Sequence, residues 1–143
     1  MDRTKTRYFT TKVGAGSLHK KPSFFSDCIS ETVYGDSNKI LKYHKEWVFI
    51  ECEDGYKGWI NKFYGLVTEK KNNPKYFVVY PRDNGLFDPN FPFGSKVGKK
   101  IKGTMSISKI IGLDNIINVA SNLLNIPYKW GGKTSLGFDC SGL

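Results

Sequence analysis

The sequence lacks a long hydrophobic run. Its most prominent apolar stretches, WVFI at 47–50 and KIIGL at 109–113, are far shorter than the ~20 residues that a membrane-spanning helix needs. The charged N-terminus is not followed by an apolar segment of roughly 7–15 residues, which a secretory signal requires. We therefore expect no membrane span and a cytoplasmic location.

Cysteine and histidine are also scarce. Cys28, Cys52 and Cys140 are widely spaced and form no Cys-x-x-Cys pair, so the sequence predicts no metal site, no cofactor and no disulfide framework. Cys28 and Cys52 are expected to be small buried hydrophobic residues. The only histidines, His19 and His44, fall in the N-terminal part of the chain.

Acidic residues are too few to balance the basic ones. The 22 Lys and Arg side chains outnumber 13 Asp and Glu side chains, which gives a net charge of +9. Because the lysines are spread along the chain, a solvated lysine-rich surface is favoured over nucleic-acid binding. The charge is compatible with an acidic small substrate.

Much of the chain has the pattern of short β-strands. The first 25 residues are polar and are expected to be irregular. Residues 26–67 then mix β-branched, aromatic and alternating polar residues, with a tight turn at EDG (53–55), which predicts a small barrel. The charged, proline-containing segment 67–75 is typical of a linker.

Beyond this linker the strand pattern is weaker. YFVVYP at 76–81 predicts one strand, and KVGKKIKG at 96–103 predicts one more. Three prolines between residues 81 and 92 argue against regular structure there.

The pattern changes to a helical one near residue 113. Apolar residues recur there at the spacing of one helix face, at Leu113, Ile116, Ile117, Ala120, Leu123 and Leu124. Asp114 is expected to help cap the start of this helix. Pro127 is expected to end it soon after Asn125.

The closing segment places Cys140 between Asp139 and Ser141. A cysteine attacks as a thiolate, and the head of a second helix at DCSGL would lower its pKa from about 8.5 and offer N–H groups to an oxyanion. Gly131 and Gly132 would let the preceding loop approach closely. A purely structural cysteine is the alternative.

The segment PYKWGGKTSLGFDCSGL (127–143) resembles the nucleophile motif of the NlpC/P60 family of cell-wall cysteine peptidases. The resemblance implies the start of a papain-like α+β domain and cleavage of amide bonds in peptidoglycan peptides. Residues 26–60, with the DGYKGW turn, resemble the bacterial SH3-like domain of the γ-D-glutamyl-L-diamino acid endopeptidase branch, also called dipeptidyl-peptidase VI-like. Residues 77–97 resemble its second SH3-like unit in reduced form.

These patterns and resemblances together predict four parts: an N-terminal extension at 1–25, an SH3-like small β-barrel at 26–67, a reduced second SH3-like region at 68–110, and the incomplete start of the catalytic domain at 111–143.

The resemblance also implies roles for individual residues. Cys140 would be the nucleophile, and Asp139 and Ser141 would bind the free amine of the substrate's L-Ala. Tyr128 would orient the substrate beside the nucleophile. Trp130 with the two glycines after it would shape the pocket wall.

Tyr56 and Trp59 are further candidates for this wall, on the SH3-like side. Each of these assignments has a structural alternative. Asp139 and Ser141 could cap the helix, Trp59 could belong to the barrel core, and Tyr128 and Trp130 could simply fill space.

A histidine base and a third polar residue are needed to activate such a thiol. The family places both many tens of residues after the cysteine, and neither His19 nor His44 matches the motif position. We therefore expect a chain truncated after the nucleophile motif and inactive alone. Its substrate class would be short murein peptides of the L-Ala-γ-D-Glu-diamino acid type. The alternative is a non-catalytic SH3-like module that binds cell-wall peptides or a protein partner.

Overall fold

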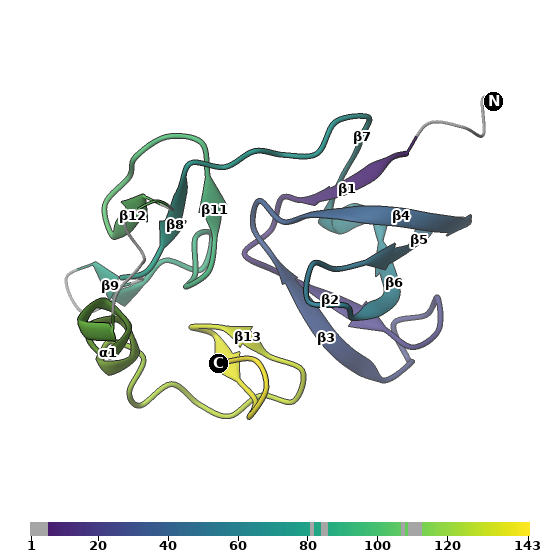
Figure 1. Cartoon of the computed structure of the whole chain (residues 1–143). Coiled ribbons are helices and arrows are strands. Elements are labelled where there is room, and N and C mark those ends of the chain that lie inside the picture. The colour runs from purple at the N-terminus through teal and green to yellow at the C-terminus, as the bar shows by residue number, and fades with distance from the viewer. Residues whose placement is uncertain (1–5, 81, 84–85, 107, 109–112) are drawn as a thin grey trace.

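A seven-stranded antiparallel sheet dominates the first 68 residues (Figure 1). The computed structural model describes residues 6–80, 82–83, 86–106, 108 and 113–143. The strands of this sheet are β1 (Tyr8–Thr11), β2 (Ala15–His19), β3 (Cys28–Val33), β4 (Ser37–His44), β5 (Trp47–Glu51), β6 (Lys57–Asn61) and β7 (Gly65–Thr68). Their spatial order is β3-β2-β6-β5-β4-β1-β7. A short 3₁₀ turn, η1 (Lys62–Tyr64), joins β6 to β7.

The sheet curls around one apolar core. Phe9, Leu18, Val48, Ile50 and Ile60 come from four different strands and are all completely buried in one cluster. In β5 the alternation of the strand sends Val48 and Ile50 inward. Burying each of these side chains contributes about 1.5–3 kcal/mol, so the core is the main source of stability for this sheet.

The N-terminal segment is part of the sheet. Strand β1 pairs with β4 and β7, and β2 pairs with β3 and β6. The expected irregular structure is therefore wrong for residues 8–11 and 15–19. Although the segment is mostly polar, Phe9 and Leu18 each supply one core side chain. A buried hydroxyl of this segment is satisfied as well, because Thr11 Oγ1 lies 2.6 Å from Thr32 Oγ1.

A smaller three-stranded sheet follows the extended linker at 69–75. Its central strand β8 (Tyr76–Val78) pairs with β11 (Lys96–Val97) and β12 (Thr104–Ser106). The strand predicted at 76–81 is confirmed as far as Val78. Of the strand predicted at 96–103, only the first two residues form a strand, β11. The proline-rich stretch also holds two short strands that were not expected. These are β9 (Arg82–Asp83) and β10 (Leu86–Phe87), which pair in an antiparallel manner.

The predicted helix is confirmed as α1 (Leu113–Ser121). It ends before the expected position, because the chain turns through 122–125 and Asn125 has a φ of +67°. Ile116 and Ile117 are both more than half exposed, so much of the apolar face of α1 is open to solvent. Asp114 lies inside the helix rather than ahead of it, and its side chain lies outside the described part.

The architecture is therefore mostly β, with one α-helix among the residues described. No helix in the described ranges is long and apolar enough to cross a membrane. The SH3-like identity of the two sheets and the papain-like identity of the last part stay predictions.

Candidate active site

The closing motif folds back on itself as a small hairpin. Strand β13 (Lys133–Thr134) pairs with β14 (Gly137–Phe138), and Tyr128 forms a parallel bridge with Phe138. The Lys129 N–H donates to the Phe138 carbonyl at 3.0 Å. These bonds bring the Trp-Gly-Gly turn and the Asp-Cys-Ser triplet side by side, although several residues separate them in the sequence.

Asp139 is the polar centre of this arrangement. Its Oδ1 accepts the N–H groups of Ser141 at 3.0 Å and Gly142 at 2.7 Å, and also the Ser141 hydroxyl at 3.0 Å. Its Oδ2 accepts the N–H of Gly131 at 2.9 Å. Acceptance from the second and third residues of a turn is the geometry of a helix N-cap. The capping interpretation of Asp139 thus has direct geometric support.

The same hydrogen bonds change the acidity of this carboxyl. Partial desolvation alone would raise the pKa of Asp139. The Ser141 hydroxyl and the N–H groups of Ser141, Gly131 and Gly142 outweigh desolvation and lower the pKa below its ordinary value. Asp139 is therefore an anion at neutral pH, held by its own loop.

Cys140 is the first residue of the turn that Asp139 caps, and it is exposed. The expected second helix is a single turn over 140–142, closed by the Gly142 N–H to the Asp139 carbonyl at 3.3 Å. Exposure to solvent is what a nucleophilic role of this cysteine would require.

Glycines allow the two halves of the motif to pack backbone against backbone. Gly131 has a φ of +73°, which favours glycine. A Cβ on Gly142 would lie 1.9 Å from the Gly132 carbonyl oxygen. The close approach expected at Gly131 and Gly132 is therefore confirmed.

The hairpin docks on the seven-stranded sheet, where β13 lies beside β3 (Figure 1). Glu31 in β3 is buried and binds the Lys129 ammonium with Oε1, while its Oε2 accepts the Lys133 N–H at 3.2 Å. The Lys133 ammonium pairs with Asp54. Its nitrogen also lies 4.9 Å from the centre of the Tyr56 ring.

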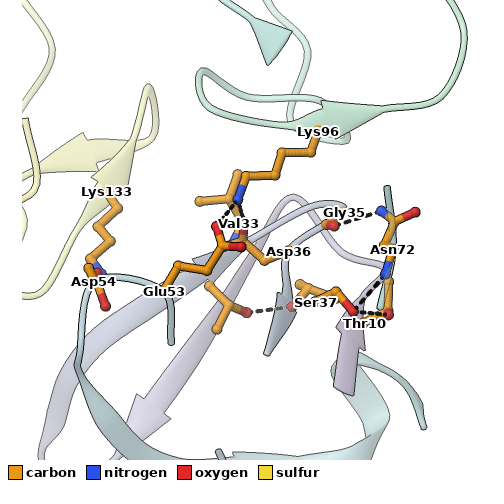
Figure 2. A network of polar contacts seen from close by, with 12 residues as sticks. Thr10, Val33, Gly35, Asp36, Ser37, Glu53, Asp54, Asn72, Lys96 and Lys133 are labelled. Carbon is orange, nitrogen blue, oxygen red and sulfur yellow. Dashed lines mark hydrogen bonds and ion pairs between the residues drawn. The ribbon is translucent and has the colours of Figure 1, made fainter. Parts of the chain in front are cut away.

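A second group of charges joins the middle of the chain to the same sheet (Figure 2). The Lys96 ammonium lies 2.9 Å from both Asp36 and Glu53. A cavity of about 210 Å³ lies between these groups and the Lys133–Asp54 pair. Glu31, Asp54, Lys96 and Lys133 were missed by sequence reasoning, because a charged residue in a polar segment carries no local mark of a distant partner.

The remaining predicted site residues fall in two places. Tyr128 and Trp130 lie in the closing motif, with 66% and 72% of their surfaces exposed. The Tyr56 ring lies against the ammonium group of Lys133, which belongs to the same motif. Trp59 instead packs on the sheet surface against Phe49, with 5.2 Å between ring centres. The structure therefore brings Tyr56 to the closing motif, and its contacts place Trp59 in a separate aromatic cluster.

Both histidines have contacts in the N-terminal sheet. Buried His19 places its Nδ1 2.9 Å from the Ser26 carbonyl oxygen. The His44 ring lies 6.1 Å from that of Trp59. Within the described ranges, no group of three or more His, Cys, Asp or Glu residues could hold a metal ion. Cys52 is buried as predicted, whereas Cys28 is only half-buried.

Comparisons with known proteins bear on the family. No family model matches the chain. It is 27% identical over 115 residues to the gamma-D-glutamyl-L-lysine dipeptidyl-peptidase of Bacillus subtilis (strain 168), covering 62% of this chain and 38% of that protein. It is 47% identical over 32 residues to the "Probable peptidoglycan endopeptidase LytE" of the same organism, covering 22% of this chain and 10% of that one.

A crystal structure of an NlpC/P60 family protein from Bacillus cereus ATCC 10987 is similar with a TM-score of 0.39 and 20% identity, over 99% of this chain and 35% of that one. The chain thus spans well under half the length of these proteins. The family predicted from the closing motif is confirmed by the sequence relatives: the chain is related to the NlpC/P60 peptidases.

Proposed function

We propose that this chain carries the nucleophile of a cysteine peptidase that hydrolyses amide bonds in short peptidoglycan peptides. The observation that carries the proposal is the position of Cys140, which is exposed at the start of a turn that Asp139 caps. The Trp-Gly-Gly turn is hydrogen-bonded to the same Asp139 carboxylate. The names of the two relatives, a dipeptidyl-peptidase and a peptidoglycan endopeptidase, support the substrate class.

The chemistry would be acyl transfer through a thioester. The Cys140 sulfur forms a bond to the carbonyl carbon, the amide C–N bond breaks, and the amine leaves with a proton. Water then cleaves the thioester. Such a thiol needs a histidine to take its proton. Because His19 and His44 have their contacts in the N-terminal sheet, the proposal requires a further histidine.

The finer proposal names the bond between γ-D-glutamate and a diamino acid, in a peptide with a free L-Ala amine. The SH3-like sheet would allow only such short peptides to reach the thiol, and Tyr56, Tyr128 and Trp130 would form the pocket wall. The reaction would take place in the cytoplasm. Asp139 and Ser141 would bind the free amine, but the existing hydrogen bonds of Asp139 restrict how they can do so. The Asp139 oxygens already accept four hydrogen bonds, so an ammonium would have to share them.

The test is incubation of the chain with L-Ala-γ-D-Glu-L-Lys and with the diaminopimelate analogue, followed by mass spectrometry of released dipeptide. Release that disappears in Cys140→Ala supports the peptidase. Saturable binding without release, equal in wild type and Cys140→Ala and unchanged when a histidine-bearing segment of a relative is added, supports the alternative of a non-catalytic binding module. If neither binding nor release is detected, in the chain alone or with an added histidine-bearing segment of a relative, both proposals are contradicted.

A further inference from the structure

Lys133 connects the closing hairpin to two different parts of the seven-stranded sheet. Its backbone N–H donates to the buried Glu31 of β3 at 3.2 Å. Its ammonium pairs with Asp54, in the turn between β5 and β6, and lies over the Tyr56 ring. One residue therefore joins the hairpin to a strand and to a neighbouring turn.

The connection from Lys133 to the thiol is short. The adjacent Gly132 carbonyl accepts the Asp139 N–H at 3.2 Å, and the Gly131 N–H donates to Asp139 Oδ2 at 2.9 Å. Asp139 in turn caps the turn that begins with Cys140. A short series of hydrogen bonds through the backbone and the Asp139 carboxylate thus connects Lys133 to the turn at Cys140.

Partial burial makes the ion pair more than a loose surface contact. Only 19% of the Lys133 side chain is exposed to solvent, and 42% of the Asp54 side chain is exposed. Pairs shielded in this way are screened less by salt than fully exposed ones. The other charges facing the same cavity are Glu31, bound to Lys129, and the Lys96–Asp36–Glu53 group.

We propose that Lys133 is a positioning residue that sets the nucleophile loop on the sheet, through its pair with Asp54 and its backbone bond to Glu31. It holds Tyr56 against the loop at the same time. The inference rests on the proposed function only in taking Cys140 as the reacting group. The thiol is positioned by the sheet as well as by its own loop.

The experiment is amide hydrogen exchange by NMR on the whole chain, with the Tyr56 ring signals as a second readout. Lys133→Gln is expected to speed exchange at the Gly131 and Asp139 amides by roughly two- to fivefold, the range for a single ion pair of this exposure. The Tyr56 ring signals should shift, because the cation above the ring is lost. Amides of β5 and β6 should keep their wild-type rates.

Two further variants separate positioning from general destabilisation. Lys133→Arg should keep wild-type exchange, and the charge swap Lys133→Glu with Asp54→Lys should return the two amides toward it. Lys57→Gln is the matched control. The Lys57 ammonium lies 2.9 Å from Glu51, in a cross-strand pair between β5 and β6. If Lys133→Gln does not fold, Asp54→Asn removes the same pair.

Unchanged exchange at Gly131 and Asp139 in Lys133→Gln, or no recovery in the charge swap, would overturn the inference. An equal effect of Lys57→Gln would do the same. Dipeptide release is measured separately. A chain that shows the expected exchange but never acts on murein peptides contradicts the proposed function and leaves the role of Lys133 standing.

Discussion

Asp139 Oδ2 accepts the backbone N–H of Gly131 at 2.9 Å, across eight residues of the closing motif. The same carboxylate caps the turn at Cys140 through its other oxygen. One side chain therefore joins the Trp-Gly-Gly turn to the turn at Cys140. This makes Asp139 a structural residue of the site, whatever it contributes to substrate binding.

The first prediction concerns this cap. Asp139→Ala should speed amide exchange at Ser141 and Gly142 about fivefold, since loss of a capping acceptor typically costs ~1 kcal/mol. Asp139→Asn should keep most of the protection, because its side-chain carbonyl still accepts hydrogen bonds. NMR exchange rates provide the measurement. Equal losses in the two variants would show that the negative charge, and not the acceptor, holds the turn.

The second prediction concerns acid titration of Glu53. Hydrogen bonds from Lys71 and then Lys96, opposed by partial burial, lower the pKa of this carboxyl to about 2. A depressed pKa means that the contribution of Glu53 to stability is complete above its unfolded pKa of about 4.3 and is lost as the pH falls toward 2. Carbon chemical shifts of the Glu53 carboxyl should therefore titrate near pH 2.

Lys71→Gln and Lys96→Gln provide the controls, and each should raise the Glu53 midpoint. A midpoint near the ordinary value in the wild-type chain would mean that the ion pairs between the linker, β11 and the sheet do not form in solution.

Local patterns predicted the parts of this structure whose causes are local. The helix at 113–121 follows from the spacing of its apolar residues, and the turn at 53–55 from its Asp-Gly pair. The closing motif was found because its residues are neighbours in the sequence. Strands β1 and β2 were missed, since Phe9 and Leu18 are isolated apolar residues in polar segments.

The docking of the site was beyond sequence reasoning for a different reason. Glu31 and Lys133 are 102 residues apart, and Asp54 and Lys133 are 79 apart. Neither separation has a periodicity that a single sequence displays. Which acid meets which lysine is decided by how the hairpin packs on the sheet, and that packing exists only once both have formed.

The third prediction concerns the reactivity of the cysteines. Burial, with a further effect from Asp54, raises the pKa of the Cys52 thiol to about 12. Thiolates, and not thiols, react with iodoacetamide. At pH 8 exposed Cys140 should therefore be alkylated first and Cys52 last, with half-buried Cys28 between them. Peptide mass spectrometry measures the order, and denaturant should abolish it. Labelling of Cys52 as fast as Cys140 in the folded chain would contradict the burial of the sheet core.

The last prediction concerns the N-terminal segment, which the structure places in the sheet and not outside it. Phe9 and Leu18 are completely buried, so Leu18→Ala should lower the free energy of unfolding by about 2–5 kcal/mol and Phe9→Ala by about 3–5 kcal/mol. Phe25→Ala is the matched control, because Phe25 is fully exposed, and its effect should stay within about 0.5 kcal/mol. Denaturant unfolding followed by tryptophan fluorescence measures all three. If Phe9→Ala and Leu18→Ala were as harmless as Phe25→Ala, residues 8–19 would be an appendage, and the sheet on which the closing hairpin docks would have to be built without them.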